Sequence, residues 1–337
     1  MTVLTLKDCH CSQNGVENMR FSRVGIIVLL GLLTLFGANC SIYNKVIARK
    51  NVVDGAEAFK NRKLDEAEAL FRQAVSRAPV GSQEQKTAEL FLARTLHSQF
   101  INNRTLTDKA EEAIKEYRKV IDVDPKDNSS FKAVANLYDS LGRKDDWQKW
   151  VTDRSERTDI PNEQRAEAYT SLASKENTCA NDITEDPKVK KTAQKDGKSV
   201  FTFTKPENAE DFEKLKGCVQ RGMDLINKAL ALETDQVGNS KGLNVKPLSD
   251  KELKDKNDFL KPFESARSYN LSLLIQSMRL AEMEGRTADK DKFKADADAA
   301  REKFKELSDV TKSIKDELEE RAKIAAGEDA NSNAAKK

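Results

Sequence analysis

A set of small, aromatic and proline residues occurs twice near the start of the chain with the same spacing. Small residues allow two antiparallel helices to approach closely, an aromatic side chain fills the space beside them, and proline ends the second helix. A repeat of this kind predicts stacked helix pairs, with a thin core between neighbouring helices. The first set is Ala67, Phe71, Ala74 and Pro79, and the second is Ala113, Tyr117, Val120 and Pro125.

The composition agrees with long helices. The chain of 337 residues contains 14 glycines and 7 prolines, so breaks between helices are few. Basic and acidic residues number 58 and 56, for a formal net charge of +2. A nucleic-acid-binding protein needs an excess of basic residues gathered on one surface. We therefore expect no nucleic-acid partner.

Residues 48–81 resemble a tetratricopeptide repeat (TPR). Gly55 takes the small position of the first helix, and the first set of residues above supplies the second helix and its closing proline. The resemblance extends over residues 45–308 and is strongest in the first two repeats. It implies an all-α, TPR-like helix-pair solenoid with a long C-terminal capping helix. It also implies a scaffold that binds other proteins or peptides in a groove lined by the first helices, with no enzymatic activity, cofactor or metal.

Three repeats are expected within residues 45–160. The third begins at Asn128, and its first helix carries residues in register with the first repeat. Trp147 stands where the second helix of a repeat has a small residue, so this pair is expected to pack differently. The residues in register are Ala135, Tyr138 and Gly142.

A fourth helix pair with a polar insert is expected over residues 161–235. Its helices are predicted at 162–175 and 209–232. Between them, the alternating residues 198–205 predict the edge of a short hairpin. Residues 236–260 are expected to form a second polar segment, a connector.

The fifth pair, residues 261–326, is expected to start at Phe263 and to end with a long helix from Thr287. That helix outruns an ordinary repeat, so it is either the cap that such arrays require or a coiled-coil handle. Residues 327–337 are small and polar and are expected to be disordered. Apolar residues mark one face of the long helix: Phe293, Ala297, Ala300, Phe304, Leu307, Val310, Ile314 and Leu318.

Residues 1–44 are expected to form a leader, signal or membrane anchor. An uncharged apolar run, 24–38, follows Arg20 and Arg23, as in a secretory signal. The sequence Gly-Ala-Asn-Cys at 37–40 resembles a bacterial lipobox, although that pattern has an aliphatic residue first and a small residue third. Lipidation of Cys40, an uncleaved anchor and ordinary cleavage all remain open. Each places the rest of the chain outside the cytoplasm, in a bacterial cell envelope.

The cysteines agree with an oxidising compartment. Beyond the leader and Cys40, the chain holds the single pair Cys179 and Cys218, the number expected for one disulfide. A bridge that closes a loop of about forty residues would stabilise the fold by roughly 3–4 kcal/mol. The run Cys9-His10-Cys11 has too few ligands for a structural zinc site.

Signals for chemistry are weak, and one binding feature stands out. His97 has no cysteine or second histidine near it in the sequence, and no phosphate-binding loop or nucleophile motif is present. Lys132 and Asn136 lie four residues apart on the first helix of the third repeat. The resemblance implies a role for them in gripping the terminal carboxylate of a partner peptide. The alternative to a protein-binding scaffold is an enzyme or ligand-binding protein with its site in the inserts at 176–208 or 236–260.

Overall fold

The computed structural model describes the backbone of residues 23–195 and 197–334. Side chains are described from Ile42 to Gly327, apart from residues 193, 195, 196 and 198. The chain divides into two compact units, residues 1–116 and 117–337, which we treat separately. The run Cys9-His10-Cys11 lies outside the described residues, and the side chains of residues 24–38 and of Cys40 are not described.

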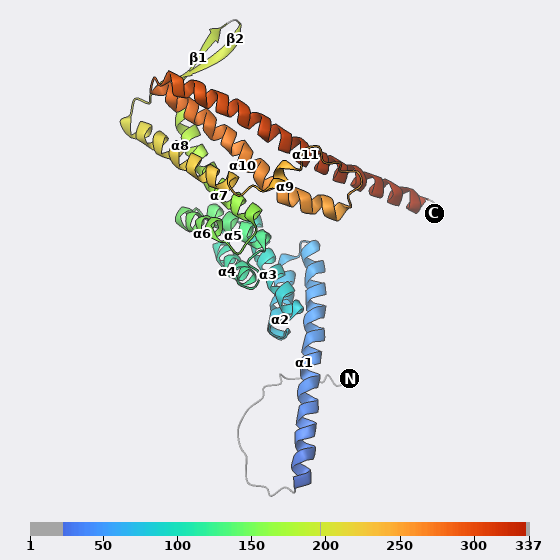
Figure 1. Cartoon of the computed structure of the whole chain (residues 1–337). Coiled ribbons are helices and arrows are strands. Elements are labelled where there is room, and N and C mark those ends of the chain that lie inside the picture. Colours follow the sequence, from blue (N-terminus) through green and yellow to red (C-terminus); the bar gives the residue numbers. More distant parts are fainter. Residues whose placement is uncertain (1–22, 196, 335–337) are drawn as a thin grey trace. The chain divides into compact units, whose positions relative to one another are not determined.

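The first unit contains the first helix pair and the start of the second. α1 packs on α2, and α2 packs on α3 (Figure 1). α1 is continuous from the predicted leader into the first repeat, with no break near residue 44. The helices are α1 (Arg23–Lys60), α2 (Leu64–Arg77), α3 (Gln83–Asn102) and α4 (Thr107–Val123), the last of which crosses into the second unit.

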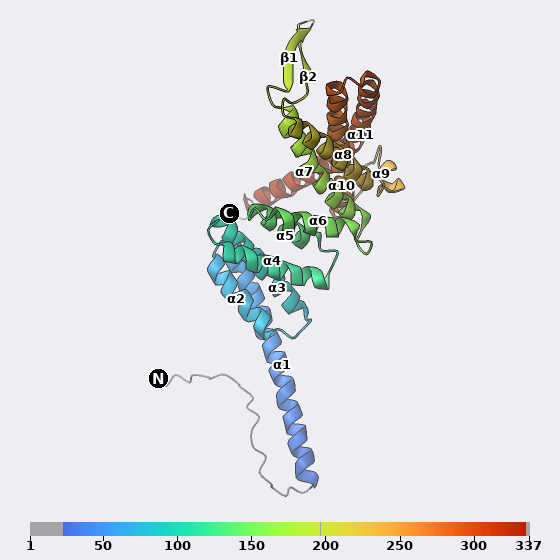
Figure 2. The same ribbon diagram turned by 90° about the vertical axis from the view of Figure 1, so that its left-hand side faces the viewer.

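The second unit contains three further helix pairs and a hairpin. α7 packs on α8, and α10 packs on α7, α8 and α11 (Figures 1 and 2). Its elements are α5 (Asn128–Ser140), α6 (Lys144–Glu156), α7 (Asn162–Thr184), β1 (Lys190–Lys195), β2 (Lys198–Phe203), α8 (Ala209–Leu230), α9 (Asp235–Gly238), α10 (Asp250–Met283) and α11 (Thr287–Ala334). The two strands pair antiparallel, from Lys190 opposite Phe203 to Lys195 opposite Lys198.

The turn within a helix pair has the same geometry in three of the pairs. Arg62, Gly142 and Gly285 each adopt a positive φ, of 61°, 70° and 73°. In each turn the following residue donates its backbone N–H to the carbonyl five residues earlier, as in the Schellman motif that ends many helices. The same type of turn thus joins the two helices in each of these three pairs. The prediction of an all-α stack of TPR-like helix pairs is confirmed.

Close helix packing in the first pair depends on Gly55. A Cβ atom at this position would lie 2.8 Å from Cε1 of Phe71, which is 0% exposed. Phe71 also stacks on Phe91 of α3, with ring centroids 5.5 Å apart. Gly222 has the same role in the second unit, where a Cβ atom would lie 2.6 Å from Cδ2 of Leu273. Ordinary side chains at these two crossings would force the helices apart.

Three element boundaries differ from those expected. α7 continues to Thr184 rather than ending at 175. α10 begins at Asp250, within the predicted connector, because Ser249 and Glu252 form a capping box and Pro262 is accommodated inside the helix. The predicted start at Phe263 is therefore wrong. α11 is helical to Ala334, beyond Gly327, where a disordered tail was expected.

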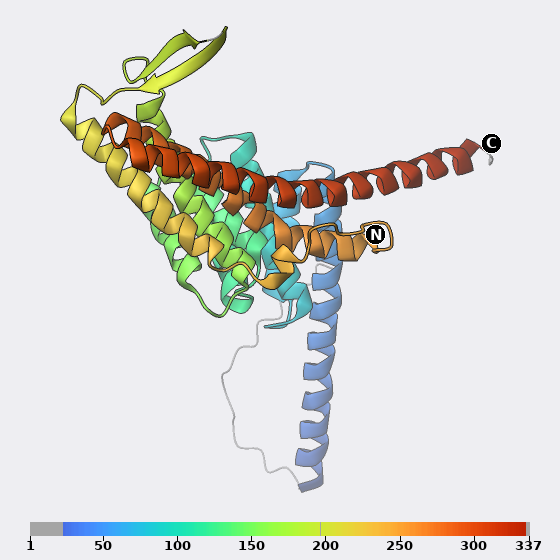
Figure 3. The same cartoon turned by 45° about the horizontal axis from the view of Figure 1, so that its top comes forward.

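The long C-terminal helix packs against the body of the second unit. Along α10 it buries Ala297, Ala300, Leu307, Val310 and Ile314, all on the predicted apolar face. Figure 3 shows the end of α11 extending beyond the neighbouring helices. The packing is that of a cap. Arg321 adds a polar clamp, donating hydrogen bonds to the carbonyls of Lys246 and Leu248 in the connector.

We predict that Gly55→Leu destabilises the first helix pair by about 3 kcal/mol, because it overfills a gap already closed by a fully buried ring. Thermal unfolding with hydrogen exchange over α1 and α2 measures the effect. Gly327→Leu is the control, since Gly327 lies in a helix with nothing within 4 Å of an added Cβ. Equal stability of the two variants would contradict the packing role of Gly55.

Candidate interaction groove and insert

A polar groove of about 550 Å³ lies in the second unit, where α5, α7 and α10 meet. α5 and α7 begin at its rim, and α10 contributes the residues on either side of Pro262. It is lined by Asn128, Ser129, Lys132, Glu163, Gln164, Glu167, Asp255, Asn257, Asp258, Phe259, Lys261, Pro262 and Ser265. A second hollow of about 500 Å³ adjoins it and shares Asp255 and Phe259.

A buried arginine behind the groove fixes two of its lining residues. Arg154 of α6 is 3% exposed and stacks over the ring of Phe131, 4.7 Å from the centroid. Its guanidinium donates to the side-chain oxygens of Asn128 and Gln164 and to the carbonyl of Pro125. Desolvation lowers the pKa of Arg154 from its usual value. These three acceptors include no carboxylate, so the arginine positions polar groups, while the charge of Glu167, which lines the groove, partly offsets the effect of desolvation on the pKa of Arg154.

The start of α5 is held by Asp127, next to the groove. Its carboxylate accepts hydrogen bonds from the backbone N–H groups of Ser129 and Ser130, the usual N-cap arrangement. Burial raises the pKa of Asp127, but the hydrogen bonds from these two serines outweigh burial and hold the pKa below its ordinary value. The cap therefore stays ionised and fixed at neutral pH.

Both lysines of the groove are already paired with carboxylates. Lys132 Nζ lies 2.5 Å from Oε1 of Glu167, whose other oxygen accepts from Asn128 Nδ2 at 2.7 Å. Lys261 Nζ lies 2.7 Å from Oε2 of the buried Glu264. The two positive charges are thus neutralised within the fold.

Three acids of the groove have no such partner. Within the described part of the chain, no hydrogen bond or ion pair engages the carboxylates of Glu163, Asp255 and Asp258. Asp255 and Asp258 are exposed, and Glu163 is half-buried. Pro262 also has no N–H to donate to the carbonyl of Asp258, so that oxygen loses its helical donor. The groove therefore offers unpaired acceptors beside the half-buried ring of Phe259.

The structure puts the two residues of the predicted binding pair, Lys132 and Asn136, in different environments. Lys132 lines the groove, but its ammonium is bound to Glu167. Asn136 is exposed one turn further along α5 and is not among the lining residues. His97 is half-buried in α3. Sequence spacing did not reveal the acids of α10, because they lie in the segment expected to be a connector.

The residues predicted to pack the repeats occupy the expected places. Ala67, Phe71, Ala74, Ala113 and Tyr117 are buried. Pro79 and Pro125 are half-buried and follow the ends of α2 and α4. Trp147 is half-buried at the margin of the third pair, with Lys175 Nζ 4.9 Å from its ring centroid. It borders the core of this pair rather than filling the crossing.

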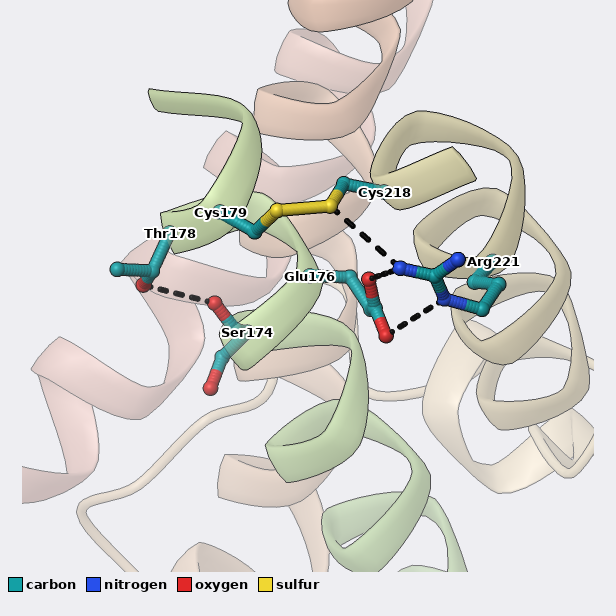
Figure 4. The surroundings of a disulfide bond; sticks show 6 residues. All are labelled: Ser174, Glu176, Thr178, Cys179, Cys218 and Arg221. Atoms are coloured by element: carbon teal, nitrogen blue, oxygen red, sulfur yellow. Dashed lines mark hydrogen bonds and ion pairs between the residues drawn. A yellow bond between two sulfur atoms is a disulfide. The ribbon is translucent and has the colours of Figure 1, made fainter. Parts of the chain in front are cut away.

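Cys179 and Cys218 form a disulfide between α7 and α8 (Figure 4). Their Cα atoms are 6.1 Å apart, and their sulfur atoms are 1.99 Å apart. Cys179 lies inside α7 rather than after its end, because α7 is longer than expected. Beside the bridge, Arg221 donates two hydrogen bonds to Glu176, at 3.0 and 2.9 Å. These hydrogen bonds to the carboxylate of Glu176 raise the pKa of Arg221.

The disulfide belongs to the apolar cluster on which the hairpin stands. Val189 and Phe203, at the base of the hairpin, pack with Cys218, Leu280 and Met283. Arg279 of α10 lies over the ring of Phe203, 4.5 Å from the centroid. The predicted strand at 198–205 is confirmed as β2, and the bridge closes the loop that carries it.

We predict that peptide mapping without reductant recovers Cys179 and Cys218 in one crosslinked peptide. Cys179→Ser with Cys218→Ser should lower the free energy of unfolding by about 3–4 kcal/mol, because the unfolded chain regains the freedom of a large loop. Urea unfolding measures the loss. As a control, reductant should destabilise the wild-type protein and leave the double variant unchanged. Finding both thiols free in protein purified without reductant would contradict the bridge.

No helix whose side chains are described is long and apolar enough to span a membrane. Among the same residues, no group of three histidine, cysteine, aspartate or glutamate side chains is arranged to hold a metal ion.

No protein family and no curated protein matches the sequence. Similar solved structures include the pilF protein of Pseudomonas aeruginosa and a tetratricopeptide repeat protein from Parabacteroides merdae. They are 11% and 12% identical to the chain, and each comparison covers 79% of this chain and 98% of the other. The TM-score is 0.31 for both.

Proposed function

We propose that the chain is a membrane-tethered TPR-like scaffold of a bacterial cell envelope, and that its groove holds a basic segment of another protein. The observation that carries this proposal is the charge of the groove. Glu163, Asp255 and Asp258 are unpaired, whereas Lys132 and Lys261 are neutralised by carboxylates of the fold. A segment that brings lysine or arginine side chains supplies the missing partners.

The surroundings of the acids suit a peptide. Phe259 and Pro262 provide an apolar wall for the methylene stems of long basic side chains. The carbonyl of Asp258 offers an acceptor for an ammonium or for a backbone N–H. Charge complementarity of this kind sets partner choice and association rate more than raw affinity. The scaffold therefore suits a reversible, salt-sensitive interaction.

The carboxylate-gripping role for Lys132 and Asn136 receives less support. A partner carboxylate would have to displace Glu167 from Lys132, and it would enter among three unpaired acids. Asn136 does not line the same hollow. The geometry therefore favours a cationic partner over an anionic one.

A ligand-binding role for the connector is the second candidate. Asp255, Asn257, Asp258 and Phe259 come from the predicted insert 236–260 and line the groove. An untargeted activity screen in which turnover disappears with Asp255→Asn and Asp258→Asn would favour an enzyme. Partner capture without turnover favours the scaffold.

We predict that Glu163→Lys with Asp258→Lys weakens binding of a fluorescent oligolysine peptide at least several-fold and makes the remaining binding less sensitive to salt. Fluorescence anisotropy measures binding. Stability should change little, because exposed or half-buried surface positions tolerate such changes within about 0.5 kcal/mol each. Glu302→Lys with Asp309→Lys, at exposed positions of α11, is the control, since it changes the net charge by the same amount. Unchanged binding in the double variant would remove the groove from the proposal.

The proposed tether is the amino-terminal segment. Its apolar run, 24–38, belongs to α1, which continues without a break into the first repeat. A helix of fifteen residues rises about 22 Å, short of the roughly 30 Å of a hydrocarbon core. Lipidation of Cys40 would supply an anchor that does not depend on spanning length.

We predict that the protein fractionates with membranes, with its repeats accessible from outside the cytoplasm. Metabolic labelling with palmitate should be lost in Cys40→Ala if Cys40 carries the lipid. Cys179→Ala is the matched control, since it removes a cysteine outside the leader. Equal labelling of Cys40→Ala and wild type would exclude Cys40 as the lipid site, and recovery of the chain in the soluble cytoplasm would exclude the tether.

A further inference from the structure

The second hollow, of about 500 Å³, differs from the groove in the chemistry of its lining. Its apolar part comes from Leu243 and Phe259, which are half-buried, and from Leu260, which is 2% exposed. Among its lining residues the only carboxylate is that of Asp255, which also lines the groove. The second hollow therefore suits a more apolar group than the groove does. It is lined by Gln236, Asn239, Ser240, Leu243, Asp255, Lys256, Phe259 and Leu260.

α10 forms the ridge between the two hollows. Residues four apart on an α-helix lie on the same face. Asp255 and Phe259 are such a pair, and both line the groove as well as the second hollow. Asp258 lines only the groove, whereas Lys256 and Leu260, another pair four apart, line only the second hollow. A peptide that crosses α10 at Asp255 and Phe259 can therefore place one side chain in each hollow.

The connector wall of the second hollow is held in place by the fold. Figures 1 and 2 show α9, where this wall begins, beside α10. Leu243 packs against the core of the second unit. On one side of it, Lys241 Nζ lies 2.6 Å from Oε1 of Glu306, and on the other, Lys246 Nζ lies 2.8 Å from Oε2 of Glu317. Both glutamates belong to α11. Because this wall is already ordered, a ligand has little ordering cost to offset.

The charges around the second hollow disfavour another basic side chain there. Lys256 is exposed at its edge, and its ammonium repels a lysine or arginine placed nearby. Gln236 and Asn239 are exposed, and their amides can bond to peptide backbone groups without a preference for charge. Burial of an apolar side chain against Leu243 and Phe259 is favourable.

We propose that the second hollow binds an apolar side chain of the same basic segment that the groove holds. This inference rests on the proposed function and describes the partner more closely. The partner carries a lysine or arginine within about three residues of a side chain the size of leucine or phenylalanine. An extended chain advances about 3.3 Å per residue, so three residues span the roughly 10 Å width of a helix such as α10.

The test measures fluorescence anisotropy with the full chain in detergent micelles. Each probe peptide has four lysines and a stretch of three further residues, placed after the lysines in one set and before them in another. In three peptides of each set, leucine stands one, two or three residues from the lysines and serine fills the rest. The reference peptide has serine at all three places. All of these peptides carry the same charge, so the ratio of leucine to serine affinities reports the apolar side chain alone.

Wild type should bind the best leucine peptide at least about fivefold more tightly than its serine reference, because the leucine is removed from water. Leu243→Ala should lower this ratio at least about twofold, because it removes the apolar wall. Leu248→Ala is the matched control. Leu248 is also a half-buried leucine of the connector that packs against the same core, but it does not line the second hollow. Thermal unfolding of both variants checks that they are folded.

A charge reversal tests the second hollow without removing any packing. Lys256→Glu, at an exposed position, should tighten binding of a peptide of seven lysines at least about threefold, because the second hollow then accepts a basic side chain. Lys312→Glu, at an exposed position of α11, makes the same change in net charge and should have a smaller effect. Equal effects of the two reversals would overturn the proposal.

The groove variant Glu163→Gln with Asp258→Asn separates this inference from the proposed function. It should weaken binding of leucine and serine peptides by similar factors and leave their ratio unchanged. If the serine peptides bind and every leucine peptide gains less than fivefold in wild type, the second hollow is not an apolar subsite and the groove keeps a purely basic partner. Equal ratios in Leu243→Ala and Leu248→Ala would overturn the inference in the same way. Failure of every lysine peptide to bind would remove the proposed function together with the inference.

Discussion

The close approach of helices at two glycines sets the geometry on which the rest of the structure depends. At Gly55 the first pair closes on Phe71, and at Gly222 α8 closes on Leu273 of α10, with Cβ of Glu176 on α7 only 3.3 Å from where a Cβ would lie. The second crossing therefore fixes three helices at one point. α7 and α10, two walls of the groove, hold their spacing because α8 can approach both of them without a side chain between.

Short-range residue patterns in the sequence were enough to predict the helix pairs and the disulfide. The spacing of Ala67, Phe71 and Pro79 was enough to identify helix pairs, and the even cysteine count pointed to Cys179 and Cys218. Boundaries were missed where a distant contact overrides a local signal. A proline such as Pro262 usually indicates the end of a helix. α10 nevertheless continues through Pro262, because Leu253 and Leu260, which precede it, are buried in the core of the second unit.

The groove was beyond the reach of sequence reasoning for the same reason. Its walls come from three helices that are far apart in the chain, and its charge depends on which carboxylates are already used. Lys132 looks available on its own helix, but Glu167 on α7 neutralises it. Conversely, the acids of α10 sit in a run of mixed charge that has the pattern of a solvated face. Only the arrangement in space separates Asp258, which is unpaired, from Glu264, which is held by Lys261 and Thr311.

The disulfide has a consequence for how this architecture can change. It joins α7 to α8 below the hairpin, so the two helices are linked whatever the intervening segment does. Lengthening the loop between α7 and α8 raises its entropic closure penalty by only about 0.6 kcal/mol per doubling of its length. Because the bridge holds the ends of this loop together in the unfolded chain as well, much of that penalty no longer lowers the stability of the helix pair. The bridged helices α7 and α8 thus form a fixed base, and the segment between them can be exchanged during evolution for segments of different length and sequence while the repeats retain their packing.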